Sequence, residues 1–174
     1  ATLVEDAERS LACGPCALGI GTPGSLSRLG GVMRNANSTC LNGRALLADL
    51  QLRLRRPLQM ANDANCFAIS EATDGAGAGA ATVFGVILGT GVGGGVVIDG
   101  NLLTGARGLA GSLGQTAVES GAFRFEDMIS GFAMAAQAKA QGYPADTRHL
   151  FRCAEAGDEW AQAIVGKACS RLAN

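Results

Sequence analysis

The stretch Gly89-Thr90-Gly91-Val92-Gly93-Gly94-Gly95 directly follows an apolar run, Thr82 to Leu88, with the composition of a buried strand. The residues after it, Val96-Val97-Ile98, are again typical of a strand, so the glycines are expected to join two strands of a hairpin. Because glycine has no Cβ, such a turn can bring backbone N–H groups close to phosphate oxygens. The pattern is neither a Walker loop nor a dinucleotide fingerprint, since neither Lys-Ser/Thr nor a helix follows. A merely flexible turn is the alternative.

The stretch Ala61-Asn62-Asp63-Ala64-Asn65 places a carboxylate after a short apolar strand, predicted over Leu58 to Ala61. Asp63 is expected to be the N-cap of a helix that runs to about Thr73. A carboxylate at the carboxyl end of a strand can act as a general base toward an alcohol, and asparagine amides suit sugar hydroxyls. A cap without any further function is the alternative interpretation.

Working outward, the pattern predicts an α/β chain whose strand ends carry the functional loops. The Gly/Ala-rich stretch Asp74 to Ala81 is the expected boundary between two parts, residues 1–80 and 81–174. An antiparallel meander is expected over 82–103. The other predicted elements are helices over 2–12, 44–55, 126–141, 146–155 and 158–172, a strand over 16–20 and an irregular loop over 32–42.

Composition argues against several classes of protein. The net charge of −1 over 174 residues gives no reason to expect nucleic acid or an anionic membrane as a partner. The cluster of Arg53, Arg55 and Arg56 is interpreted as a solvated helix end. No apolar run approaches the roughly 20 residues that span a bilayer, and residues 1–10 do not resemble a signal peptide. We therefore expect a cytoplasmic protein without membrane contact.

Six cysteines are present, and two of them form Cys13-Gly14-Pro15-Cys16. This spacing occurs in redox sites and in half of a zinc site, but zinc needs two more ligands and redox catalysis usually places the pair at the start of a helix. We expect buried or incidental thiols in a reducing compartment.

Four ordered motifs carry a resemblance to a known family: Gly19 to Gly24, Asn35 to Thr39, Ala61 to Cys66 and Thr82 to Gly95. From about residue 17 to residue 114 the chain resembles the ROK family of sugar kinases and repressors, and within it bacterial fructokinases or mannokinases. The resemblance implies an actin-like ATPase (ribonuclease H-like) fold in two lobes, here incomplete. It also implies ATP, Mg²⁺ and a hexose of the fructose or mannose type.

The resemblance assigns roles by position. Asp63 resembles the catalytic base that accepts the proton of the sugar hydroxyl. Residues 1–80 then form part of the N-terminal sugar-binding lobe, and residues 81–174 begin the nucleotide-side lobe. The residues that resemble sugar-binding positions are Gly24, Asn37, Asn62 and Asp63, and those that resemble phosphate-binding positions are Gly89, Thr90 and Gly91.

The sequence also departs from the family pattern at several positions. Nothing before residue 17 matches the family's first phosphate hairpin. Ser112 stands where the family has a sugar-binding carboxylate, and Gln115 where it has a histidine that touches sugar and ligates zinc. Thr116 to Arg124 contains no cysteine, so no zinc site is expected. The family's adenosine site is also missing, and kinase activity is expected to be impaired in this partial chain.

Two other interpretations stay open from the sequence. The chain could be a non-catalytic sugar-binding or regulatory module, since the family includes repressors. It could also be a structural piece that works in a homodimer, where a second copy covers apolar surface and sheet edges.

Overall fold

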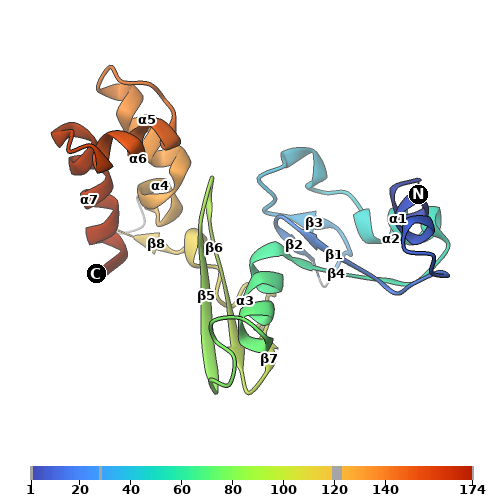
Figure 1. Cartoon of the computed structure of the whole chain (residues 1–174). Coiled ribbons are helices and arrows are strands. Elements are labelled where there is room, and N and C mark those ends of the chain that lie inside the picture. Colours follow the sequence, from blue (N-terminus) through green and yellow to red (C-terminus); the bar gives the residue numbers. More distant parts are fainter. Residues whose placement is uncertain (1, 28, 119–122, 174) are drawn as a thin grey trace.

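The computed structural model describes residues 2–27, 29–118 and 123–173. Figure 1 shows two arms joined by a lower central part. The elements from Thr2 to Asn62 lie in the N-terminal arm. Those from Asp63 to Leu103 lie in the central part, and the helices from Glu126 to Ala173 form the other arm. This arrangement leaves space between the arms above the central part.

The N-terminal arm is organised by two parallel strands, β1 (Leu18–Thr22) and β4 (Leu58–Asn62). Thr22 pairs with Asn62 at their carboxyl ends, so the loop after β1 and the helix after β4 begin side by side. The remaining elements of this arm are α1 (Thr2–Ser10), β2 (Ser25–Leu26), β3 (Met33–Arg34), the 3-10 helix η1 (Thr39–Leu41) and α2 (Leu46–Leu54).

The central sheet is the predicted antiparallel meander of β5 (Thr82–Leu88), β6 (Val92–Ile98) and β7 (Asn101–Leu103). The glycine-rich stretch is not all turn, however. β6 begins at Val92, so the turn is confined to residues 89–91 and the glycines at 93–95 lie within the strand.

The strand glycines are explained by close packing of α3 (Asp63–Thr73) on the sheet. A Cβ on Gly93 would lie 2.9 Å from the Cβ of Ala64, and one on Gly95 would lie 2.9 Å from the Cβ of Ala68. Real Cβ atoms do not approach each other so closely, so small residues on both elements are required. This packing holds the first turn of α3 against the hairpin, across the predicted boundary at Asp74 to Ala81. The division into two lobes stays a prediction.

Helices dominate the C-terminal arm, which contains the main apolar cluster of the described residues. The buried members are Val92, Met128, Ile129, Met134, Ala138, Leu150, Ala161, Ile164 and Ala168. The elements are η2 (Leu113–Gln115), β8 (Ala117–Val118), β9 (Phe123–Arg124), α4 (Glu126–Ile129), α5 (Gly131–Ala140), α6 (Thr147–Glu155) and α7 (Glu159–Ala173).

The predicted helix over 126–141 is interrupted. Ser130 has an extended backbone (φ −67°, ψ 158°) that ends α4, and its side chain accepts a hydrogen bond from the N–H of Ala133. A serine that caps a new helix satisfies an orphan N–H, which makes the break favourable at this position.

Two local predictions were wrong, and of the two alternatives for the cysteines, buried or incidental thiols, the first is excluded. The N-cap of α3 is Asn62, whose Oδ1 accepts the N–H of Asn65 at 3.2 Å, and Asp63 is the first helical residue. Arg56 is not a solvated helix end, because it pairs with Glu8 and its side chain is only 19% exposed. The cysteines are not buried: Cys66 and Cys153 are half-buried and the other members, Cys13, Cys16, Cys40 and Cys169, are exposed.

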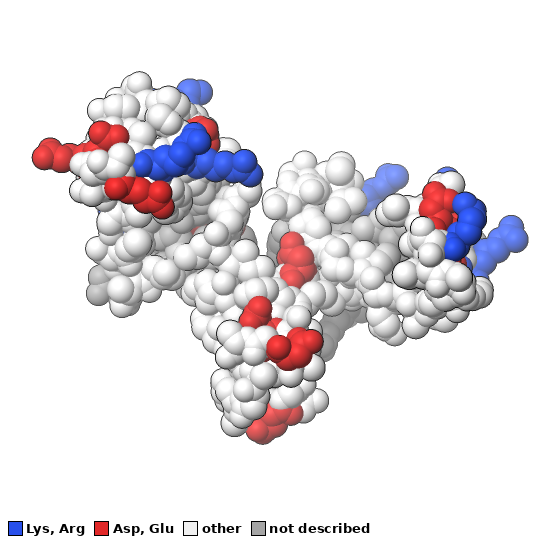
Figure 2. Space-filling view, viewed as in Figure 1, with Lys and Arg blue, Asp and Glu red and all other residues white. Residues whose placement is uncertain are grey.

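Charge is distributed unevenly over the face drawn in Figure 2, where basic and acidic side chains mix on both arms and acidic ones alone lie over the lower central part. Among the described residues, no helix is long and apolar enough to cross a bilayer.

Candidate functional site

A polar cavity of about 630 Å³ collects the predicted site residues from separate parts of the chain. It is lined by loop residues after β1 and β3, by the first turn of α3, by the tip of the β5–β6 hairpin and by the segment before α5. All of the predicted site residues line it, namely Gly24, Asn37, Asn62, Asp63, Gly89, Thr90 and Gly91.

An apolar cavity of about 440 Å³ adjoins the polar one and shares Gly89, Thr90 and Phe132 with it. Helices α5, α6 and α7 supply most of its lining, and none of the lining side chains carries a charge. The polar cavity is therefore the candidate functional site, because of the two only it is lined by carboxylates that can accept a proton and by side-chain amides.

Asp63 is exposed in the first turn of α3, where the helix dipole favours a carboxylate. Its Oδ1 accepts hydrogen bonds from its neighbour's N–H (Ala64, 2.8 Å) and from the side-chain amide of Asn62 (3.1 Å). Both hydrogen bonds that the described residues donate to this carboxylate go to Oδ1. The second oxygen, Oδ2, is thereby left available as a proton acceptor.

Asn62 ties three elements together. While its Oδ1 caps α3, its Nδ2 donates to the carbonyl of Gly24 at 2.9 Å and to Asp63. Gly24 has a φ of +75°, and a Cβ there would lie 2.7 Å from the N atom of Ala36. Glycine thus lets the loop after β1 pass close to the segment that carries Asn37.

Asn37 lines the same cavity with an exposed side chain. Its Oδ1 accepts the N–H of Ser38 at 2.7 Å, which fixes the amide at the start of η1. In the described part of the chain it makes no hydrogen bond to Asn62 or Asp63. The structure brings Asn37 to the cavity wall without a direct contact to the carboxylate.

The tip of the β5–β6 hairpin is anchored on its outer side by the start of α5. The N–H of Gly131 donates to the carbonyl of Gly89 at 2.8 Å, and the N–H of Phe132 donates to the carbonyl of Thr90 at 3.3 Å. Within the turn, the N–H of Gly89 donates to the carbonyl of Gly91 at 2.9 Å. These bonds hold a polar, glycine-rich backbone segment at the cavity wall.

A polar network in the opposite wall was missed by sequence reasoning as a part of the site. Gln115 donates to Glu126 Oε1 at 2.7 Å across 11 positions of sequence, and Arg124 donates to Gln115 Oε1 at 3.3 Å. Arg124 also pairs with Asp127 at 3.2 Å. In the sequence Glu126 stands at the start of a predicted helix, and only the fold brings it beside Gln115.

Arg124 also affects the pKa of a carboxyl group in this wall. Hydrogen bonds from its N–H and its guanidinium lower the pKa of Asp127 below the ordinary value of 3.8. Asp127 in turn raises the pKa of Arg124. Both shifts favour the charged forms of Arg124 and Asp127.

The tip of the β5–β6 hairpin lies close to the wall that carries Glu126. A Cβ on Gly91 would lie 3.3 Å from Glu126 Oε2, so glycine keeps the gap between hairpin tip and wall open. Among the described residues, no group of three or more His, Cys, Asp or Glu side chains is placed to hold a metal ion. The absence of zinc stays a prediction, and the expectation for Thr116 to Arg124 falls partly on 119–122, outside the described residues.

The chain is similar to several known proteins. The chain is 42% identical over 114 residues to the N-acetyl-D-glucosamine kinase of Photobacterium profundum, covering 66% of this chain and 37% of that relative. It is 44% identical over 122 residues to the N-acetylgalactosamine kinase AgaK of a Shewanella species, covering 69% and 39%. The crystal structure of the ROK hexokinase from Thermus thermophilus matches with a TM-score of 0.82 and 32% identity, covering 98% of this chain and 60% of that one.

The chain thus spans less than two thirds of the length of each of these relatives. As expected from the sequence, the described elements form a mixed α/β part of the actin-like ATPase fold of the structural relatives. A family model described as the ROK family matches residues 1–174. With that match extending over the whole sequence, the chain belongs to the ROK family of sugar kinases and related proteins.

Proposed function

We propose that this chain carries the sugar-binding and proton-accepting part of an ATP-dependent hexose kinase. The observation that supports the proposal best is the polar cavity. The Asp63 carboxylate, the Asn62 amide and the tip of the β5–β6 hairpin all line it. A proton acceptor for an alcohol beside a backbone segment suited to phosphate is the arrangement that phosphoryl transfer needs.

In this proposal Asp63 Oδ2 accepts the proton of the sugar hydroxyl that attacks the phosphoryl group. Asn62 Nδ2 orients the carboxylate by donating to Asp63 Oδ1, and it holds the loop after β1 by donating to the Gly24 carbonyl. Asn37 and Glu126 line the cavity where they can hydrogen-bond further hydroxyls. ATP supplies the phosphoryl group when it is bound, and Thr90 and Gly91 would lie against its phosphates.

The substrate class is proposed to be a hexose or an N-acetylated hexosamine. The sequence resemblance favoured a fructose or mannose type, whereas the relatives reported above are named as kinases of N-acetylglucosamine and N-acetylgalactosamine. We favour the N-acetylhexosamines, since identities of 42% and 44% over two thirds of the chain carry more weight than the short motifs.

The test is a binding titration of the chain with N-acetylglucosamine, N-acetylgalactosamine, fructose and mannose, followed by ligand-observed NMR. We expect saturable binding of an N-acetylhexosamine that is lost in Asn37→Ala and Asn62→Ala. Phe151→Leu, an exposed position outside the polar cavity, is the matched control and should bind like the wild type. If none of the four sugars binds, the proposal is wrong.

A non-catalytic sugar-binding module is the second candidate, favoured by Ser112 and Gln115 in the cavity wall, where the family pattern has a carboxylate and a histidine. A coupled assay for hexose-dependent ADP release separates the two. Sugar binding without ADP release, in the presence of ATP and Mg²⁺, favours the second candidate. The homodimer and the cytoplasmic location stay predictions.

A further inference from the structure

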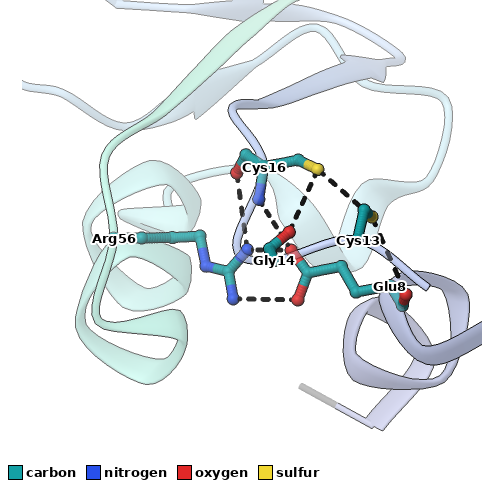
Figure 3. A network of polar contacts seen from close by, with 5 residues as sticks. All are labelled: Glu8, Cys13, Gly14, Cys16 and Arg56. Carbon is teal, nitrogen blue, oxygen red and sulfur yellow. Dashed lines mark hydrogen bonds and ion pairs between the residues drawn. The ribbon is translucent and has the colours of Figure 1, made fainter. Parts of the chain in front are cut away.

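The thiols of Cys13 and Cys16 lie next to each other, and neither residue lines the polar cavity. Their Sγ atoms are 3.5 Å apart, and both residues are exposed in the turn between α1 and β1 (Figure 3). No other pair of thiols is in contact within the described ranges. A disulfide needs an Sγ–Sγ distance of about 2.05 Å, so a small movement of one side chain would close it.

A network of polar contacts holds Cys16 in place from both sides. The Glu8 carboxylate accepts the N–H of Cys16 at 2.9 Å, and Arg56 donates to the Cys16 carbonyl at 3.4 Å. Glu8 and Arg56 also form an ion pair with each other, with Arg56 Nη2 to Glu8 Oε2 at 3.2 Å. Figure 3 shows this ring of contacts around the Cys16 backbone.

Cys13 is also held by hydrogen bonds to Glu8. Its backbone N–H donates to the carbonyl of Glu8 at 3.1 Å and its Sγ donates to the same carbonyl at 3.7 Å, while the Sγ of Cys16 donates to the carbonyl of Gly14 at 3.2 Å. Both thiols therefore lie over the same short turn, and both backbones are hydrogen-bonded. This arrangement raises the effective concentration of one thiol at the other.

We propose that Cys13 and Cys16 form a reversible intramolecular disulfide by exchange with a low-molecular-weight disulfide. One cysteine thiolate attacks a sulfur of the small disulfide and releases one thiol. The second cysteine then attacks the mixed disulfide at the protein sulfur and releases the second thiol. The protein dithiol loses two electrons, the small disulfide gains them, and two protons go to the released thiols.

The electrostatics around the pair are consistent with a stable disulfide. The hydrogen bond with Cys16, burial and the nearby Glu8 carboxylate raise the pKa of the Cys13 thiol. Strongly oxidising dithiols are kept reduced by a stabilised thiolate, and the Cys13 site lacks that feature. Exchange is accordingly expected to be slow at neutral pH and faster in alkaline buffer.

The disulfide would close the short turn by which α1 leads into β1. α1 has no buried residue, and among the described residues the Glu8 contacts are its polar link to Arg56 and Cys16. The closed loop is short, so the gain in global stability is small, and the site is proposed for redox response rather than for stability.

The experiment uses the 174-residue chain with oxidised glutathione at about pH 8.5, near the ordinary thiol pKa. The reaction is quenched with acid, and free thiols are then labelled with N-ethylmaleimide. Digestion with trypsin gives a peptide 10–28 that contains Cys13 and Cys16 and a peptide 35–44 that contains Cys40. We expect peptide 10–28 to be lighter by two hydrogens and unlabelled, and to regain two labels after reduction. Cys40 is the internal control and should carry glutathione or label.

Two variants test the arrangement. In Cys16→Ser, peptide 10–28 should retain glutathione on Cys13 because the second step is removed. In Arg56→Gln, closure should slow roughly tenfold, the effect of losing a hydrogen bond to a charged group. Arg53→Gln, in the last turn of α2 and close in sequence, is the matched control and should close at the wild-type rate. Two labels on wild-type peptide 10–28 after oxidation, a persistent glutathione adduct there, or a cross-link to Cys40 would overturn the proposal.

Discussion

The side-chain amide of Asn62 donates a hydrogen bond of 3.1 Å to Asp63 Oδ1. The same nitrogen donates to the carbonyl of Gly24 at 2.9 Å, while Oδ1 of Asn62 caps α3. One asparagine therefore positions the proposed base, the loop after β1 and the helix that carries the base. These functions can be separated by substitution.

Asn62→Ala should destabilise the chain by about 1 kcal/mol, the usual effect of losing an N-cap oxygen, and should weaken sugar binding. Asn62→Asp keeps a capping oxygen but loses the donor to Gly24 and places a second carboxylate beside Asp63. It should bind sugar as weakly as the alanine variant while retaining most of the stability. Denaturant unfolding and calorimetric sugar titration measure the two effects, and equal losses of stability in both variants would contradict this assignment.

Asp63→Asn should leave stability nearly unchanged, because the amide oxygen can still accept the N–H of Ala64. Any hexose-dependent turnover should fall by roughly 10²-fold or more in kcat, the scale of a lost general base. Initial rates at saturating sugar and ATP check this. Asp49→Asn, in α2 and outside the cavity, is the control for a charge change. An unchanged kcat in Asp63→Asn would exclude Asp63 as the base.

Gly93→Ala should destabilise the chain by about 1–3 kcal/mol, the typical range for overpacking. The new Cβ would lie 2.9 Å from that of Ala64, so α3 has to move away from the hairpin. Gly166→Ala is the opposite case, since it lies in α7 with nothing within 4 Å, and it should stabilise by about 0.5–1 kcal/mol. Thermal unfolding of both variants should shift in opposite directions, and shifts of the same sign would refute the packing argument.

The Glu8–Arg56 pair predicts a pH dependence. A hydrogen bond from Arg56 and one from the N–H of Cys16 lower the pKa of Glu8 below its ordinary value of 4.5. The pair's contribution to stability is therefore complete above about pH 4.5 and is lost as pH falls through the lowered pKa. The stability gap between wild type and Glu8→Gln should be constant at neutral pH and close in acid. Glu5→Gln, on the same helix, should show no such gap, and a gap that widens in acid would be inconsistent with this pairing.

ATP should bind the isolated chain only weakly. The β5–β6 hairpin offers backbone groups to one side of a polyphosphate, and such solvent-exposed contacts are screened by salt. We expect a Kd in the millimolar range, equivalent to about 4 kcal/mol. Calorimetry in low and high salt measures it. Micromolar affinity would show that helices of the C-terminal arm, or a second chain, supply further contacts.

Local structure was predictable where a residue pattern decides it without help from distant parts of the chain. The alternating and apolar runs over 82–103 predicted the meander, with β5 and β7 at their observed bounds. Asp63 was correctly expected at the end of a strand and the start of a helix. The predicted N-cap was off by one residue because Asn and Asp cap almost equally well.

The glycine-rich stretch was only half understood from the sequence. Gly89 and Gly91 do lie in a turn at the cavity, but Gly93 and Gly95 serve the approach of α3. A pattern within one segment cannot reveal which helix will pack on it. The same limit applies to Glu126 and Gln115, whose contact depends on the path of the chain between them.

By itself, the sequence determined the α/β class, the order of its elements, the family and the identity of the proposed site residues, since these follow from local patterns and short motifs. The tertiary structure decided which residues share the cavity, which glycines are needed for packing, and that Cys13 and Cys16 lie in contact beside an ion pair. The physical reason is that hydrogen bonds and close packing act over a few ångströms in space, whatever the separation along the chain.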